Sequence, residues 1–193
     1  MKILLFLAKG VELIEASAFI DVFGWHRQYN KEDIEVVTCG VKREIISTFG
    51  IPLKADLLID EVAEEDFAAL VIPGGFGEYG FYEDAYDERL LELIRRFNDA
   101  EKMIASVCVG SFPLGKSGVL RGRRGTTYHL INGRKQKQLA ELGVNIVVDE
   151  PVVIDGNIIS SWCPSTAIEV AFKLLEILST KEDAARVREL MGY

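Results

Sequence analysis

The chain has 193 residues, of which 49% are apolar, so it can bury a full hydrophobic core, and we expect a single domain over residues 1–193. Its formal net charge of -8 at pH 7 repels phosphate backbones, which argues against nucleic acid as a partner. Three widely spaced cysteines suit a reducing cytoplasm better than a disulfide scaffold or a zinc site, and no stretch approaches the roughly 20 apolar residues of a membrane helix, so we expect a soluble protein.

Five apolar runs predict the strands of a sheet. The first, at residues 3–8, has no polar member, which is typical of a strand covered on both faces in a parallel sheet. Similar runs follow at residues 34–38, 68–72, 103–107 and 158–162. Segments with helical periodicity separate them, so the order of elements predicts α/β layers.

Two of these helical segments have a clear apolar face. Leu90, Ile94 and Phe97 recur at helical spacing, and residues 168–175 carry a second stripe of the same kind. Pro164 precedes that second stripe and suits the first turn of a helix. Each segment is therefore expected to cover the sheet with one side.

The remaining segments predict the margins of the fold. Residues 45–58 and 147–159 have shorter, more β-like patterns, and the Asp-Gly-Asn sequence at residues 155–157 predicts a hairpin turn. We therefore expect the sheet to be mixed at its edges. Residues 180–193 predict a charged final helix.

Cys108 lies where the apolar strand at residues 103–107 runs into a helical stretch. Ligands collect beyond the carboxyl ends of the strands in an open parallel sheet. Free amides and the dipole of the following helix lower the pKa of a thiol, which would favour a nucleophilic thiolate at Cys108. The alternative is that Cys108 is a small buried apolar residue. Cys39, within a β run, and Cys163, just after a strand, are weaker candidates.

A glycine-rich turn follows the strand at residues 68–72. Gly74 and Gly75 can present backbone N–H groups to a developing oxyanion. Residues 75–80 also match GxGxxG, with Asp99 about 20 residues further on. That acid precedes a strand instead of ending one, so the match does not predict a dinucleotide site.

Glu15 and His129 are the candidate proton carriers. Glu15 shares a helical stripe with Phe19 and Val22, where a carboxylate is costly unless it is protonated or hydrogen-bonded. A position in the first helical turn is the alternative explanation, because acids there complement the helix dipole. His129 follows the strand-to-helix turn at Cys108 in the chain and lies near a predicted strand end. It could act as base, acid or substrate contact, or have a structural role.

Together these segments resemble the DJ/ThiJ/PfpI superfamily over almost the whole chain. Residues 8–15 are similar to the family's opening strand and loop, which places Glu15 at the acidic partner of the cysteine. Residues 72–75 resemble its glycine turn, and residues 107–110 resemble its nucleophile elbow. The resemblance implies a three-layer flavodoxin-like sandwich of the class I glutamine amidotransferase type, with a mainly parallel sheet and helices on both faces. It also implies a homodimer with a reactive cysteine whose sulfur is hydrogen-bonded by a protonated glutamic acid.

Two departures from the family pattern and one further match bear on the site. Val109 stands where the peptidase-like branch has a histidine directly after the cysteine. The glyoxalase-like branch uses a Thr-Thr-His segment, and here an extra tyrosine intervenes, so either Tyr128 or His129 would reach the pocket. Residues 162–166 match the family's strand-to-helix junction near the site. This match brings Trp162, Cys163 and Pro164 to the pocket.

The resemblance and the residues together predict a cofactor-independent cysteine enzyme that acts on small reactive carbonyls, like a glyoxalase III or a deglycase. Cys108 would add to the carbonyl carbon, and backbone amides at Gly74, Gly75 and Val109 would hold the oxyanion. Glu15 and His129 would move protons. No metal or organic cofactor is required, and the partners are a small electrophile and a second copy of the chain.

Two other functions remain open. The first is a redox-sensing or chaperone-like stress protein in which Cys108 is oxidised to a sulfinic acid. There Cys163 could resolve a sulfenic acid on Cys108 by forming a disulfide. The second is a thiol hydrolase or hydratase of the isonitrile hydratase or amidase type.

Overall fold

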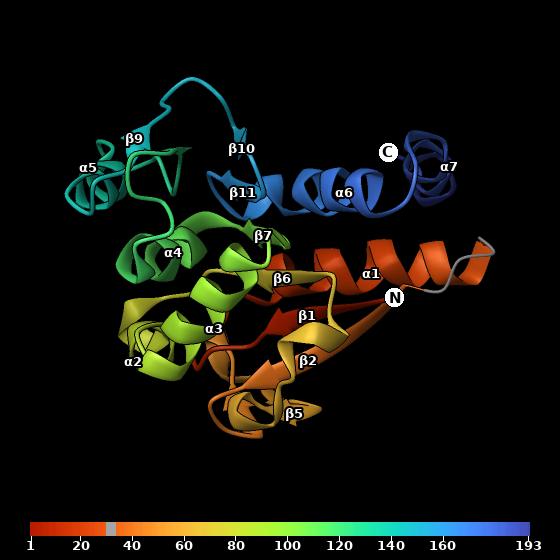
Figure 1. Cartoon of the computed structure of the whole chain (residues 1–193), viewed down its shortest axis with the longest axis horizontal. Coiled ribbons are helices and arrows are strands. Elements are labelled where there is room, and N and C mark those ends of the chain that lie inside the picture. The colour runs from red at the N-terminus through yellow and green to blue at the C-terminus, as the bar shows by residue number, and fades with distance from the viewer. Residues whose placement is uncertain (30–33) are drawn as a thin grey trace.

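The computed structural model describes residues 1–29 and 34–193, which form a central sheet with helices on both faces (Figure 1). Within these residues the sheet has seven strands in the order β10-β11-β7-β6-β1-β2-β5. Neighbouring strands are parallel except for β10 and β11. The strands are β1 (Lys2–Phe6), β2 (Glu35–Gly40), β5 (Leu57–Leu58), β6 (Ala69–Ile72), β7 (Met103–Ser106), β10 (Val152–Asp155) and β11 (Ile158–Ser161). The expected α/β class and mainly parallel sheet are confirmed.

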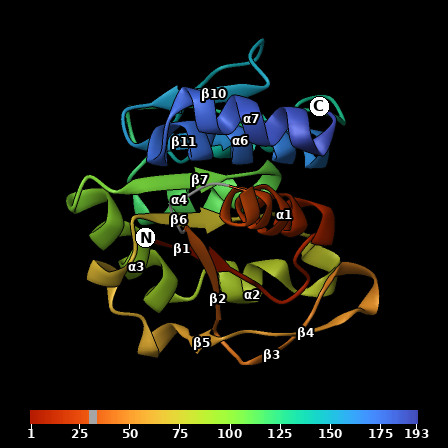
Figure 2. The same cartoon turned by 90° about the vertical axis from the view of Figure 1, so that its right-hand side faces the viewer.

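Helices form a layer on each side of the sheet. Figure 1 shows α1, α6 and α7 on one side and α2 to α5 on the other, and Figure 2 brings the first group to the front. In the first group α1 packs against both α6 and α7, and in the second α3 packs against α4. The first group is α1 (Leu13–Tyr29), α6 (Ala167–Leu178) and α7 (Lys181–Met191). The second is α2 (Phe81–Ala85), α3 (Glu88–Asp99), α4 (Ser111–Ser117) and α5 (Arg134–Ala140).

Short elements complete the layers. β3 (Glu44–Ile46) and β4 (Pro52–Lys54) form an antiparallel pair, and β8 (Arg124–Gly125) and β9 (Asn145–Ile146) form a parallel pair. The 3-10 helices are η1 (Thr48–Gly50), η2 (Ile59–Glu61), η3 (Glu64–Asp66), η4 (Gly77–Tyr79), η5 (Cys108–Gly110) and η6 (Pro164–Thr166). No described helix is long and apolar enough to cross a membrane.

The order of the strands explains where a site can form. β1 lies between β2 and β6, and β6 pairs with β7, all in parallel. Every residue of β6 is buried, as is β1 after its first residue, because helices cover both faces of these strands. The carboxyl ends of β1, β6 and β7 therefore meet at one edge of the sheet, where the connecting loops can share a cavity.

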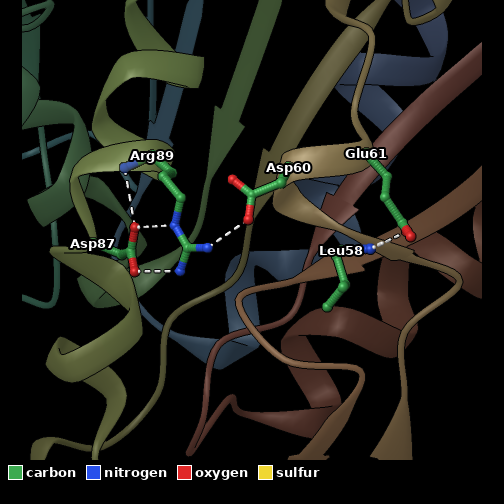
Figure 3. A network of polar contacts seen from close by, with 5 residues as sticks. All are labelled: Leu58, Asp60, Glu61, Asp87 and Arg89. Carbon is green, nitrogen blue, oxygen red and sulfur yellow. Dashed lines mark hydrogen bonds and ion pairs between the residues drawn. The ribbon is translucent and has the colours of Figure 1, made fainter.

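A polar network joins the start of α3 to η2 (Figure 3). The Asp87 carboxylate caps α3 by accepting from the Arg89 backbone N–H at 3.0 Å, and it also pairs with the Arg89 guanidinium at 2.8 Å. Arg89 Nη1 contacts Asp60 at 2.6 Å. The neighbouring Glu61 accepts from the Leu58 backbone N–H at 2.8 Å. Arg89 and Asp60 are both exposed, so this network orients the two segments and contributes little stability.

Candidate active site

The sequence builds a strained elbow at Cys108. The strand β7 ends at Ser106, and Cys108 begins η5, which leads into α4. Cys108 has a φ of 54°, in the left-handed region that L-residues rarely adopt. Such a residue costs about 1–3 kcal/mol and persists where its surroundings impose it, often at functional sites. The predicted strand-to-helix elbow is thus present.

Close packing and hydrogen bonds hold the elbow in this conformation. A Cβ added to Gly110 would lie 2.1 Å from the Ile72 carbonyl oxygen, so η5 can pack on the end of β6 because residue 110 is glycine. The carbonyl oxygen of Cys108 accepts from the Thr127 hydroxyl at 2.7 Å and from the Ser111 hydroxyl at 3.1 Å. The backbone of the cysteine is therefore fixed from both sides.

Glu15 reaches the elbow from the first turn of α1. Its side chain has 0% exposure, and its Oε2 accepts from the Gly74 backbone N–H at 2.5 Å. A Cβ added to Gly74 would lie 3.0 Å from Glu15 Oε2, 3.0 Å from the Val109 nitrogen and 3.1 Å from Cys108 Cβ. The glycine turn, the elbow and the acid thus converge at Gly74, where a side chain would separate them.

Burial keeps Glu15 protonated at neutral pH. Loss of solvent raises the pKa of its carboxyl to about 8, while the Gly74 N–H and the Cys108 thiol act to lower that pKa. A carboxylic acid with this pKa can donate a hydrogen bond at neutral pH. The position of Glu15 on the apolar stripe of α1 is therefore explained by a buried acid, and not only by an acid that complements the helix dipole.

Burial also raises the pKa of the Cys108 thiol, whose residue is 8% exposed. The neighbouring Glu15 carboxylate raises that pKa further, and the Val109 backbone N–H, which donates to the sulfur, lowers it. The expectation that elbow amides and a helix dipole bring the thiol pKa down is corrected, because desolvation outweighs them. Cys108 and Glu15 titrate as one coupled pair.

A cavity of about 540 Å³ opens at this edge of the sheet. It contains both members of the pair, and its other walls come from connecting loops, from 3-10 helices and from α2 and α5. The lining residues are Glu12, Glu15, Gly75, Phe76, Gly77, Glu78, Tyr82, Cys108, Val109, Tyr128, Leu130, Ile131, Arg134, Lys135 and Pro164. A small organic molecule fits a cavity of this size.

The candidate backbone donors differ in what they already bind. The Gly74 N–H is used by Glu15, so Gly74 fixes the acid and is not free for a substrate. Within the described residues the Gly75 N–H donates to no backbone carbonyl, because the bonds on either side of it join Glu12 to Gly74 and Phe76 to Gly10. Gly75 and Val109 both line the cavity, but the Val109 N–H already donates to the Cys108 sulfur, so Gly75 is the better placed donor.

The structure separates Tyr128 from His129. Tyr128 lines the cavity, whereas the His129 ring stacks on Trp162 with centroids 4.1 Å apart and planes 31° apart. His129 Nδ1 and Trp162 Nε1 are buried and have no hydrogen-bond partner in the part of the chain that the structure describes. Neither of these two residues belongs to the cavity wall.

At the second strand-to-helix junction, Pro164 lines the cavity as expected, whereas the preceding residue, Cys163, is not part of the cavity wall. The Cys163 sulfur is 3.5 Å from the Ser165 hydroxyl, and Cys163 is close enough to Cys108 to raise the pKa of that thiol. The three cysteines, Cys39 included, are free thiols. Among the described residues, no group of three or more His, Cys, Asp or Glu is placed to hold a metal ion.

Sequence reasoning missed one wall of the cavity. Lys135 donates from Nζ to the Tyr82 hydroxyl at 3.0 Å, and Arg134 lines the cavity beside it. These residues come from α5 and α2, which have no apolar run or motif that indicates a site. Their one sequence signal is that Arg134 and Lys135 follow the loop of Tyr128 by a few residues.

Comparison with known proteins identifies relatives of the whole arrangement. A sequence model of the DJ-1/PfpI family matches residues 1–177. A deglycase of Pyrococcus abyssi is 35% identical over 158 residues, covering 80% of this chain and 90% of the relative. Protein DJ-1 homolog A of Arabidopsis thaliana is 28% identical over 187 residues, covering 96% of this chain and 44% of the relative, so the chain spans less than half of that protein. The crystal structure of Drosophila melanogaster DJ-1beta superposes with a TM-score of 0.84 at 27% identity, covering 98% of this chain and 96% of that one.

Proposed function

Because the chain belongs to the DJ-1/PfpI family, we propose that it is a deglycase-type enzyme that uses Cys108 to act on small α-oxoaldehydes and on their adducts with amines. The observation that carries this proposal is the convergence of a strained cysteine, a buried protonated acid and a free backbone N–H on one cavity. The deglycase relatives agree with it. Such a site can add a thiol to a carbonyl without a cofactor.

The first step is addition of sulfur to the aldehyde. The reacting form of the pair has lost one proton, and the remaining proton lies on Glu15. The Cys108 thiolate forms an S–C bond to the aldehyde carbon, and the electrons of the C=O π bond move to oxygen. The Gly75 N–H stabilises this oxyanion, and Glu15 gives it a proton. The product is a hemithioacetal on Cys108.

The second stage moves a proton along the substrate. The Glu15 carboxylate removes the proton from the former aldehyde carbon, and the C–H electrons move through the adjacent carbonyl to give an enediolate. The hydroxyl proton on the first carbon moves to the oxygen on the second carbon, and Glu15 returns its proton to the second carbon. A thioester of a 2-hydroxy acid results, and water hydrolyses it to release the acid and the Cys108 thiol. The net reaction adds one water to an α-oxoaldehyde. With an amine adduct, the C–N bond breaks in the first step and Glu15 protonates the departing amine.

The sequence left open whether Tyr128 or His129 faces the substrate, and the cavity favours Tyr128. It lines the cavity, whereas His129 contacts Trp162. We therefore assign substrate contact to Tyr128 and predict that His129 acts on the reaction only by supporting the loop that carries it.

Methylglyoxal turnover tests the proposal. Wild-type protein should convert methylglyoxal to lactate, and Cys108→Ala should lose at least about a hundredfold of the activity because the nucleophile is gone. Cys39→Ala is the matched control, since Cys39 is buried in β2. Equal rates for wild type and Cys108→Ala, or turnover by neither, contradict the proposal.

A redox role is the second candidate, and the contact between Glu15 and Cys108 favours it. A protonated carboxyl beside the sulfur can donate a hydrogen bond to a sulfinate formed by peroxide. Intact mass after mild peroxide decides between the two: a gain of two oxygens on Cys108 in a protein that turns over no carbonyl supports sensing. A peptide map showing a disulfide between Cys108 and Cys163 would support resolution by Cys163.

A thiol hydrolase or hydratase would instead release product from amides or isonitriles.

A further inference from the structure

One wall of the cavity is cationic, and the proposed reaction does not use it. Arg134 and Lys135 begin α5 and line the same cavity as Cys108. The Lys135 ammonium donates to the Tyr82 hydroxyl at 3.0 Å and lies 5.0 Å from the centre of the Tyr82 ring and 5.3 Å from that of Phe112. These contacts fix its position, unlike that of a lysine on an open surface.

The ammonium lies within electrostatic range of the reactive sulfur. Burial and the charge of Arg134 lower the pKa of Lys135, and negative charges on Glu78 and Cys108 act in the opposite direction. Burial raises the pKa of Tyr82, and the charges of Tyr86 and Cys108 add to this effect. Charges influence each other over about 10 Å at moderate salt. Because Lys135 and Cys108 line the same cavity of about 540 Å³, a ligand with a short carbon chain can contact Lys135 at one end and Cys108 at the other.

The cavity also contains carboxyl groups, which can repel an anionic ligand when they are charged. Glu15 is protonated at neutral pH. The charge of Glu12 adds to the rise of the Glu15 pKa, which shows that Glu12 lies near Glu15. Glu78 is exposed on η4 and raises the pKa of Lys135. None of the ion pairs between described residues includes Lys135 or Arg134, so both cations can bind a ligand.

We propose that Lys135, assisted by Arg134, binds a carboxylate at the far end of the substrate, so that the enzyme prefers α-oxoaldehydes whose carbon chain ends in an anionic group. The inference rests on the proposed function and deepens it by naming the substrate class. Leu130 and Ile131 provide an apolar wall for the carbon chain between the two ends. An ammonium already held by Tyr82 loses little side-chain freedom when it binds an anion.

A matched pair of substrates tests this preference. 4,5-Dioxopentanoate and its methyl ester share the reacting dicarbonyl and differ in the terminal charge. Wild-type kcat/KM should be higher for the acid. In Lys135→Met the ratio of kcat/KM for acid over ester should fall at least about tenfold, mainly through KM of the acid, because a charge-assisted hydrogen bond is lost.

Three further variants separate this effect from damage to the fold. Lys135→Arg keeps the charge and should keep most of the preference. Lys137→Met removes a positive charge from the exposed side of the same helix and should leave the ratio unchanged. Glu78→Gln should raise the ratio, because a competing carboxylate is removed.

The outcomes distinguish the two proposals. If wild type turns over both compounds with a ratio that no variant changes, the carboxylate site is wrong and the proposed function stands. If neither compound is turned over, the proposed function fails, and binding of 4-oxopentanoate measured by calorimetry tests the site alone. Binding by wild type that Lys135→Met abolishes supports the carboxylate site, and absence of binding by wild type overturns it.

Discussion

At the scale of single residues, Cys108 and Glu15 lie close together away from solvent, and a negative charge on one disfavours a negative charge on the other. Each is buried, and burial raises the pKa of both. The pair therefore holds two protons at neutral pH and loses the first near pH 8, after which the remaining proton is shared between oxygen and sulfur. Reactivity of the sulfur should follow this shared titration.

Alkylation of Cys108 by iodoacetamide checks this coupling. In a background without the other two thiols, Cys39→Ser with Cys163→Ser, the alkylation rate should rise with pH and show an inflection near pH 8. Glu15→Gln should remove that inflection and move the rise to higher pH, because burial still raises the thiol pKa and no carboxyl proton is left to dissociate first. An inflection that stays near pH 8 in Glu15→Gln would show that the two groups are not coupled.

The sequence predicted the positions of Cys108, Glu15 and Gly75 in the fold better than those of the residues that surround them. Cys108, Glu15 and Gly75 lie at strand ends or on an apolar stripe, where local pattern and chemistry coincide. Tyr128 and His129 are neighbours in a loop, and which of them faces the cavity depends on a backbone path that no periodicity specifies. Lys135 becomes part of the site through its contact with Tyr82, which only the folded chain brings close.

At the scale of secondary elements, the turn from β7 into α4 depends on contact between backbones. Gly110 rests against the Ile72 carbonyl, where an added Cβ would lie 2.1 Å from oxygen. A side chain there would push η5 away from the end of β6. The cysteine would then leave the position that Thr127 and Ser111 hold.

Two glycine substitutions compare this packed position with an open one. Gly110→Ala should lower the free energy of unfolding by roughly 1–3 kcal/mol and reduce activity, because overpacking shifts the elbow. Gly24→Ala lies within α1, where an added Cβ meets nothing within 4 Å, and should raise the free energy of unfolding by about 0.5–1 kcal/mol. Urea denaturation measures both, and equal effects would contradict the packing argument.

The sheet strands were predictable because apolar runs report burial on both faces. The runs at residues 68–72 and 103–107 end within one residue of β6 and β7. The hairpin of β10 and β11 was also predicted, and Gly156 in its turn has a φ of 57°. β8 and β9 have two residues each and were not predicted, since such short pairs form through tertiary contacts and have no pattern of their own.

At the scale of the whole molecule, a buried acid makes stability depend on pH. The pKa of Glu15 is about 8 in the folded chain and near its ordinary value of 4.5 in the unfolded chain. Between these values the folded state binds one proton more, so its stability falls as pH rises through this window. Below pH 4.5 the group has no such effect, and above pH 8 the effect is complete.

Glu15→Gln should remove this contribution. The difference in free energy of unfolding between the variant and wild type should grow in favour of the variant by a few kcal/mol between about pH 5 and about pH 8. Chemical denaturation at both pH values measures the difference. Parallel stability curves for the two proteins would mean that the carboxyl is not desolvated as described.

The place of β1 inside the sheet, between β2 and β6, has a consequence for synthesis. β1 is synthesised before its two neighbours, β2 and β6, so its apolar side chains remain unpaired until residue 72 has emerged from the ribosome. The nascent chain carries an uncovered hydrophobic segment throughout that interval, which is when aggregation competes most strongly with folding. The helices α6 and α7, which pack against α1, follow the strands of the sheet in the chain, so α1 also remains uncovered until residue 191 has emerged.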